Sequence, residues 1–116
     1  MAIRKSNHNR TKAVIYKYVV NGEVVYVGKT NRALESRILE HCQELKFFGM
    51  TEVYYYETTM VKDIWRHEAY WLNHYKPILN KMIPSLNKAL GYQPRNAWHR
   101  YKGKIKYVQP LMLQQN

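Results

Sequence analysis

One acidic residue, Glu68, lies beside an apolar stripe in a segment with helical spacing. Ile64 lies four residues before it and Leu72 four residues after it, so its carboxylate is predicted at the border of a packed helix face. A half-buried charge is costly unless it is paired or binds a metal. One interpretation is a structural ion pair with Arg37 or Arg66. The other is a Mg²⁺ site, because a lone carboxylate completed by water and phosphate oxygens suits this ion.

Arg37 and His41 are four residues apart in another segment with helical spacing, so they are expected on one helix face. A guanidinium can bind a phosphate through two hydrogen bonds and stabilise the charge that develops in a transition state. An imidazole can donate or accept a proton or orient the phosphate. Taken alone, the pair fits a surface pair better than a catalytic one.

Five separated motifs follow one another in a fixed order along residues 13–81. They are Val14-Ile15-Tyr16, Tyr26-Val27-Gly28, Arg37 with His41, Glu68, and Pro77-x-x-Asn80. Their order and spacing resemble the GIY-YIG nuclease family. Val14 stands where that family has Gly, and Val27 where it has Ile, and both are apolar strand positions that carry no chemistry.

The resemblance implies a metal-dependent DNA endonuclease that hydrolyses a phosphodiester bond by attack of water and leaves 5′-phosphate and 3′-hydroxyl ends. It implies one Mg²⁺ or Mn²⁺ per active site, held by Glu68, because a second clustered acid is missing. It also implies that Tyr16 activates or positions the water and that Arg37 stabilises the developing charge. The catalytic residues that it implies are Tyr16, Tyr26, Lys29, Arg37, His41, Glu68 and Asn80.

The two motif tyrosines also have an ordinary structural interpretation. Strands favour tyrosine and the chain has eleven, so Tyr16 and Tyr26 could equally be core aromatics. The ordinary pKa of a tyrosine, about 10, makes Tyr16 a poor base at neutral pH unless a metal or Lys29 lowers that pKa.

Hydrophobic patterning predicts an α/β (α+β) fold with a small, mainly antiparallel three-stranded sheet flanked by helices, as in the GIY-YIG family, and a basic C-terminal extension. A short strand over 105–108 could be added. The predicted elements are strands over 13–19, 23–27 and 52–58, a break at 28–31, and helices over 32–46 and 60–75.

The first hairpin decides whether the two tyrosines can share a site. A two-residue turn at Asn21 and Gly22 would oppose Tyr16 to Val27 and send Tyr26 to the other face of the sheet. A three-residue turn with Gly22 as a left-handed bulge would oppose Tyr16 to Tyr26 directly. A shared site requires one face, so the three-residue turn is predicted.

The chain has 116 residues and a formal net charge of +11. All eight acids lie between Glu23 and Glu68, so both flanks are purely basic. Because such surfaces attract polyanions, double-stranded DNA is the expected partner. The single cysteine, Cys42, excludes a disulfide framework. The sequence has no apolar membrane span and no signal segment, so we expect a cytoplasmic protein that does not bind membranes.

Three segments are expected: a basic N-terminal arm over 1–12, a catalytic domain over 13–81, and a basic extension over 82–116 that packs on the core and contacts DNA. Residues 95–104 interleave bases with aromatic residues, which suits backbone contacts and base stacking. The alternative is a strap whose Trp98 and Tyr101 dock on the core while its lysines stay in solvent. The predicted DNA-binding residues are Lys12, Lys17, Lys29, Arg32, Arg95, Trp98, Arg100, Tyr101, Lys102 and Lys104.

Two other functions are consistent with the charge. One is a non-catalytic nucleic-acid-binding module that uses the same basic flanks, and the other is a protein that binds an acidic partner. Within the enzyme interpretation, one active site cuts one strand at a time. A double-strand cut would therefore need a homodimer, a higher assembly or two successive encounters.

Overall fold

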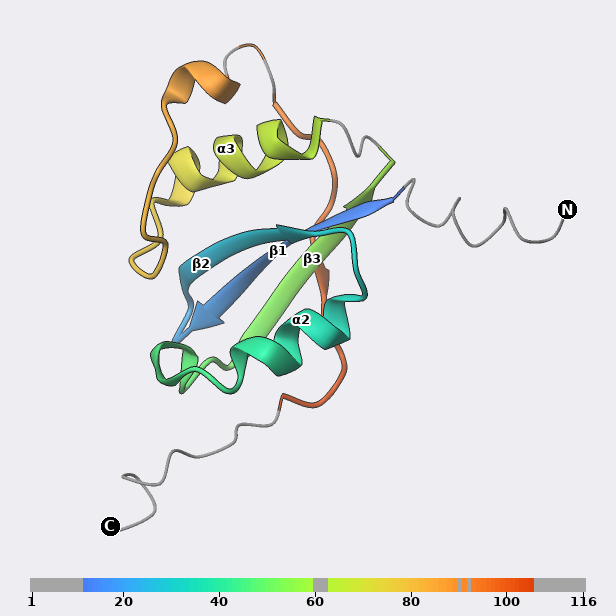
Figure 1. Ribbon diagram of the computed structural model, residues 1–116, viewed down its shortest axis with the longest axis vertical. Helices are drawn as coiled ribbons and strands as arrows, with labels where there is room; N and C mark the ends of the chain where they lie inside the picture. The colour runs from blue at the N-terminus through green and yellow to red at the C-terminus, as the bar shows by residue number, and fades with distance from the viewer. Residues whose placement is uncertain (1–11, 60–62, 90, 92, 106–116) are drawn as a thin grey trace, which may run out of the picture.

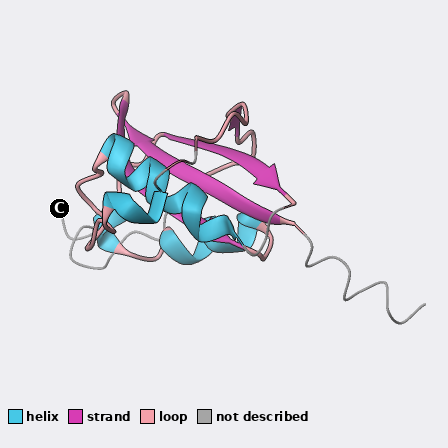
Figure 2. Cartoon of the chain, turned by 90° about the horizontal axis from the view of Figure 1, so that it is seen from above, coloured by secondary structure: helices cyan, strands magenta, loops and turns pink. Residues whose placement is uncertain are grey.

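Four antiparallel strands form one sheet in the order β2-β1-β3-β4 in this computed structural model, which describes residues 12–59, 63–89, 91 and 93–105 (Figure 1). α2 and α3 lie on opposite sides of this sheet, and Figure 2 shows the strands beside the helical segments. The elements are β1 (Ala13–Val20), β2 (Glu23–Thr30), α2 (Leu34–His41), η2 (Leu45–Phe47), β3 (Glu52–Thr58), α3 (Ile64–Tyr75), η4 (Leu86–Ala89) and β4 (His99–Arg100). Across the described ranges, no helix is long and apolar enough to cross a membrane.

The α+β fold class is confirmed, but the expected three strands are wrong. A fourth strand, β4, pairs with β3 through Tyr54 and Tyr55. The strand expected over 105–108 is not seen at Ile105, and its other residues lie outside the described ranges. The expected break at 28–31 is also wrong, because β2 continues to Thr30.

The first helix is shorter than the predicted range of 32–46, since α2 ends at His41. A continued helix would keep Leu45 on the same face as Ile38. The structure instead buries Phe47, which is 2% exposed, and leaves Leu45 50% exposed. Burying the larger aromatic ring outweighs the helical periodicity, so the chain turns into η2 before Phe47.

The β1–β2 hairpin differs from the prediction in its turn and in its register. Asn21 and Gly22 have φ values of 50° and 82°, as the two central residues of a type I′ turn require. The register then shifts at a bulge, so that Tyr18 opposes Tyr26 and Tyr16 opposes Gly28. Direct pairing of Tyr16 with Tyr26 is therefore wrong. Their common face is confirmed, because the bulge restores what the two-residue turn alone would have reversed.

Each face of the sheet has its own packed layer. On the α2 side, Tyr16 and Tyr18 of β1 pack with Ile38 and Cys42, together with Phe47. On the α3 side, the Tyr56 hydroxyl bonds His67 Nδ1 at 2.7 Å and accepts a hydrogen bond from Trp71 Nε1 at 2.9 Å. The alternation of β1 and β3 thus fixes two separate layers, and functional side chains on these strands must belong to one or the other.

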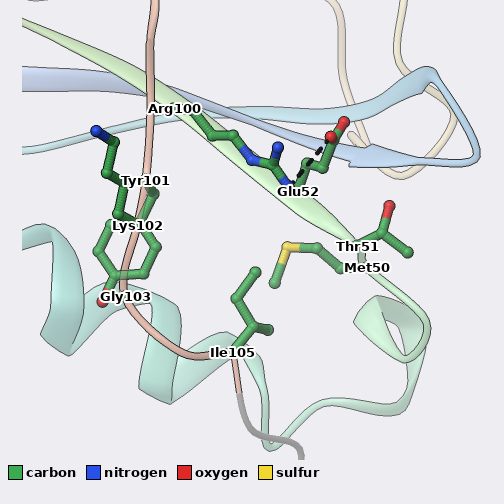
Figure 3. Close-up of a pocket in the computed structure, with 8 residues that line it drawn as sticks. All are labelled: Met50, Thr51, Glu52, Arg100, Tyr101, Lys102, Gly103 and Ile105. Atoms are coloured by element: carbon green, nitrogen blue, oxygen red, sulfur yellow. Dashed lines mark ion pairs between the residues drawn. The ribbon is translucent and has the colours of Figure 1, made fainter.

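The segment around β4 packs as a strap, as the second interpretation of residues 95–104 predicted. The Trp98 ring lies 4.9 Å from that of Tyr56 and 5.2 Å from that of Trp71, between centroids. The Tyr101 N–H donates to the Val53 carbonyl at 2.7 Å. Figure 3 shows the Tyr101 ring turned toward α2 while Lys102 extends away from it. The aromatic side chains therefore dock on the core and the lysine stays exposed.

The two tryptophans Trp98 and Trp65 provide a matched test of this docking. Trp98→Ala is expected to lower the free energy of unfolding by about 2–3 kcal/mol, because it removes ring contacts that hold the strap on the sheet. Trp65 is 41% exposed, and Trp65→Ala should change this free energy by less than about 0.5 kcal/mol. Urea denaturation followed by circular dichroism measures both, and equal effects would contradict the docking.

Candidate active site at the edge of the sheet

Tyr16 crosses the edge strand of the sheet over Gly28. A Cβ atom placed on Gly28 would lie 2.5 Å from both Cζ and Oη of Tyr16, far inside van der Waals contact. The missing side chain therefore makes the space in which the phenol lies. Because β2 is the first strand of the sheet, this brings the Tyr16 hydroxyl toward the free edge.

Arg37 of α2 holds the Tyr16 hydroxyl from the same side. Its Nε donates to Tyr16 Oη at 3.2 Å, and its second nitrogen donates to Glu40 Oε1 at 2.9 Å. Glu40 also accepts from Arg32, at 2.9 Å, and the two guanidinium groups, Arg32 first, lower the pKa of Glu40 to about 2. Arg37 is thus held by Tyr16 and Glu40, and it also has a side-chain hydrogen bond with Tyr26.

Lys29 and Glu68 form the other half of the site, on the α3 side. Lys29 Nζ donates to Glu68 Oε1 at 2.7 Å, and the Glu68 side chain is 22% exposed. The partner of Glu68 is therefore neither Arg37 nor Arg66, the two candidates considered from the sequence. Arg66 instead pairs with Asp63 at 3.9 Å.

The two halves meet at the edge formed by β2. Tyr26 and Glu68 line the same hollow, although Tyr26 lies on the α2 face and Glu68 comes from α3. The Tyr16 and Tyr26 ring centroids are 6.3 Å apart. Burial is the main cause that raises the pKa of both tyrosines, and the Glu68 charge adds a smaller effect in the same direction. Tyr16, Tyr26, Lys29, Arg37 and Glu68 are thus gathered from four elements.

The electrostatics of Tyr16 argue against a role as a base. Burial raises the pKa of Tyr16 above its ordinary value of 10, and the hydrogen bond from Arg37 lowers it only in part. Lys29 bonds Glu68 and not Tyr16, so it does not provide the expected lowering. Burial also raises the pKa of Tyr26. Both phenols therefore keep their protons at neutral pH. Tyr16 is fully buried, whereas Tyr26 lines the hollow and can donate a hydrogen bond to a phosphate or a water.

His41 lies behind the site. It is buried, its Nδ1 bonds the Tyr18 hydroxyl, and its ring packs edge-on against Tyr26 at 5.3 Å between centroids. Burial, and then the Arg37 charge, lower the pKa of His41 to about 4, so it is neutral at pH 7. In this structure His41 supports Tyr18 and Tyr26.

Asn80 holds the free edge of β2. The Val27 N–H donates to Asn80 Oδ1 at 3.0 Å, and Asn80 Nδ2 donates to the Val27 carbonyl at 2.9 Å. The neighbouring Leu79 N–H donates to the Val25 carbonyl at 2.9 Å. These bonds cap backbone groups that an edge strand leaves open, and they place Asn80 in the wall of the same hollow as Glu68.

The number of carboxylates at the site determines which kind of metal ion it could bind. Within the part of the chain that the structure describes, no group of three or more His, Cys, Asp or Glu side chains gathers around a point. Glu68 is a single partly exposed carboxylate with one cationic partner. This arrangement fits a hydrated ion such as Mg²⁺, which keeps several waters and binds one or two carboxylates, and it does not fit a closed protein cage.

The predicted DNA-binding residues fall into separate groups. Lys12, Arg95, Arg100, Lys102 and Lys104 are exposed. Arg32 is exposed but bonded to Glu40, and Arg100 pairs with Glu52 at 3.4 Å, as the dashed line in Figure 3 marks. The N-terminal arm, apart from Lys12, lies outside the described residues.

Lys17 is on the face opposite to Tyr16, and the structure does not bring it to the site. Its Nζ lies 4.2 Å from the Trp98 ring centroid and 4.8 Å from that of Tyr75, and it donates to the Tyr75 hydroxyl at 2.7 Å. Burial lowers the pKa of Lys17. The side chain thus belongs to the aromatic layer under the strap.

The comparisons with known proteins leave the site to be judged on its own geometry. No protein-family model matches the chain, and neither curated proteins nor solved structures give a significant match.

Sequence reasoning missed three contributors to the site. Gly28 was treated only as the end of a motif, Tyr18 was not singled out, and Glu40 was overlooked although it lies three residues after Arg37. The spacing of Glu40 could have indicated its ion pair with Arg37. The contact of Gly28 with Tyr16 depends on the hairpin register, which the sequence did not reveal.

The space over Gly28 is open to a direct test. Gly28→Ala is expected to lower the free energy of unfolding by about 1–3 kcal/mol, since the added methyl group meets the Tyr16 ring. The loss should be smaller in a Tyr16→Ala background, because the obstructing ring is gone. Gly22→Asn is the control, as asparagine tolerates positive φ, and it should cost less than about 1 kcal/mol. Equal losses in both backgrounds would contradict the contact.

The buried His41 predicts how stability depends on pH. Its pKa is lowered to about 4 in the folded protein from 6.5, so protons bind preferentially to the unfolded chain as the pH falls. The free energy of unfolding should therefore keep the full contribution of the neutral His41 above pH 6.5. It should decline between pH 6.5 and pH 4, by up to about 1.4 kcal/mol per pH unit. Urea denaturation across this range should show a shallower decline for His41→Gln, which cannot bind the proton. Burial also lowers the pKa of His67, so part of the decline should remain. An unchanged slope in His41→Gln would contradict the assignment.

Proposed function

We propose that this protein is a DNA endonuclease of the GIY-YIG type, with a fold of that kind and its active site at the β2 edge. The observation that supports this most is the position of Tyr16 across Gly28. Its hydroxyl is bonded to Arg37 near the edge where Lys29 holds Glu68. The ordered motifs thus correspond to side chains that are gathered in space.

The residues at the edge suit a phosphodiester. The cations Lys29, Arg32 and Arg37 outnumber the carboxylates Glu40 and Glu68 by one, which complements a singly negative phosphate. The protonated hydroxyl of Tyr26 can donate to a phosphate oxygen or fix the direction of a water, and the fully buried Tyr16 would hold Arg37 in place. Arg37 would stabilise the charge that develops on the phosphate oxygens.

Glu68 is the residue that would hold Mg²⁺ or Mn²⁺. When bound, such an ion would supply charge stabilisation at the scissile phosphate and a lowered pKa of bound water. Lys29 then has two partners available to it, the Glu68 carboxylate and the phosphate, and it can exchange between them as substrate binds. His41 and Asn80 act as positioning residues, because they hold Tyr26 and β2.

The Lys29–Glu68 contact also favours a second candidate function. An ion pair at 2.7 Å satisfies the Glu68 charge without a metal, as a structural role would require. The protein would then be a nucleic-acid-binding module that uses its basic surface and does not cut. The double-stranded DNA partner, a cytoplasmic location and any homodimer belong to the same proposal and need their own tests.

Cleavage of supercoiled plasmid separates the two functions. The purified chain is expected to nick the plasmid with Mg²⁺ or Mn²⁺, and Glu68→Gln should reduce the rate by about 100-fold or more, because the metal ligand and its charge are lost. Glu57→Gln, which removes an exposed carboxylate elsewhere on the sheet, should retain the rate. Intact plasmid with both ions, or full cleavage by Glu68→Gln, would contradict the enzyme proposal.

A further inference from the structure

A hollow of about 580 Å³ opens beside the candidate site. Tyr26, Glu68 and Asn80 form the part of its wall that belongs to that site. The rest of the wall is mainly apolar, from Leu72, Leu79 and residues 82–85. Its rim also includes three lysines from three other segments: Lys46 of η2, Lys81 of the turn after α3, and Lys88 of η4. None of these lysines belongs to the motif string. We call this set, Lys46, Lys81 and Lys88, the lysine cradle.

The cradle has a charge that the protein does not neutralise. Among the described residues that line the hollow, Glu68 is the only acid, and it is already bonded to Lys29. Within the same ranges, none of the ion pairs of the structure includes Lys46, Lys81 or Lys88, and all three are exposed. Three uncompensated positive charges therefore surround one opening next to the site.

The form of these cations indicates which anion they would bind. Lysines are mobile point charges, which suit backbone phosphates better than the fixed pattern of a base edge. They come from separate segments around an open hollow, so they can contact successive phosphates of one chain. Lys46 has a second role, as its Nζ lies 5.0 Å from the Phe47 ring centroid and 5.9 Å from that of Tyr26.

We propose that the lysine cradle binds backbone phosphates of double-stranded DNA next to the bond held at Glu68. The position of that bond rests on the proposed function, whereas phosphate binding by the cradle does not. The cradle gives the strand a path along the β2 edge, past Asn80 and onto the turn after α3. It adds affinity and places the backbone, and it carries no sequence preference of its own.

The experiment measures DNA affinity without cleavage. A fluorescent DNA duplex is titrated with the full chain in the presence of a chelator, over a series of salt concentrations. The double variant Lys81→Gln with Lys88→Gln is expected to reduce the slope of log affinity against log salt by about 2, or about 1 per lost phosphate contact. Lys46→Gln is measured separately, because it also removes the contacts with Tyr26 and Phe47.

The matched control removes the same charge outside the hollow. Arg66→Gln with Lys76→Gln also loses two positive charges, and neither residue lines the hollow. Its salt slope should change by less than about 1, since no phosphate contact is lost. Equal slope changes in the two double variants would overturn the cradle, because they would indicate a general charge effect. An unchanged slope in the cradle variant would also overturn it, and would favour an acidic protein as the occupant.

Cleavage kinetics distinguish failure of this proposal from failure of the proposed function. Where the wild-type chain cuts plasmid, the cradle variant should raise KM and leave kcat unchanged. Where the wild-type chain does not cut but the cradle variant loses its salt slope, the enzyme proposal fails and the cradle stands. If the cradle variant cuts plasmid with an unaltered KM and an unaltered salt slope, the cradle proposal fails and the enzyme proposal stands.

Discussion

The contact between the Tyr16 ring and the backbone of Gly28 is the constraint on which the candidate site depends. Side chains of neighbouring strand residues point to opposite faces, so a sheet normally keeps its two layers apart. An edge strand with a glycine allows one exception, because a long side chain from the next strand can cross it. Here the crossing brings Tyr16 from the α2 layer toward Glu68 of the α3 layer.

The same crossing explains the electrostatic character of the site. A phenol enclosed by its own sheet loses solvation, and its pKa rises even though Arg37 donates to it. The exposed end of the site contains Lys29 and Glu68, whose charges have a small desolvation cost because water reaches them. The edge therefore combines neutral hydroxyl donors on the buried side with ions on the wet side. A phosphodiester matches this arrangement, because its oxygens can accept hydrogen bonds from a hydroxyl group and its single negative charge can be neutralised by the ions.

Much of the fold follows from the sequence because it depends on local pattern. Alternating β-branched and aromatic residues identified the first three strands. The common face of Tyr16 and Tyr26 was expected because one shared site requires both side chains on the same face of the sheet. The bulge in β2 could not be predicted from local pattern, and it lies where Leu79 and Asn80, far along the chain, bond the backbone of Val25 and Val27. The early end of α2 depends likewise on the burial of Phe47, a tertiary effect. The spacing of Glu68 placed its carboxylate correctly at the helix border, but its partner Lys29 lies on another element.

The strap shows why composition alone could not assign the basic C-terminal segment. Interleaved bases and aromatic rings suit DNA stacking, yet the same pattern arises wherever one face of a segment covers a core and the other faces water. Trp98 and Tyr101 both pack on the core, and on the α3 face Lys17 fills the space between the rings of Trp98 and Tyr75. Because these two rings pack on the core, the strap would bind a polyanion through its charged side chains and not by stacking on bases. Exposed, flexible side chains do not fix the position of a DNA strand. The position of a bound strand therefore has to be set by the ordered residues at the edge of β2.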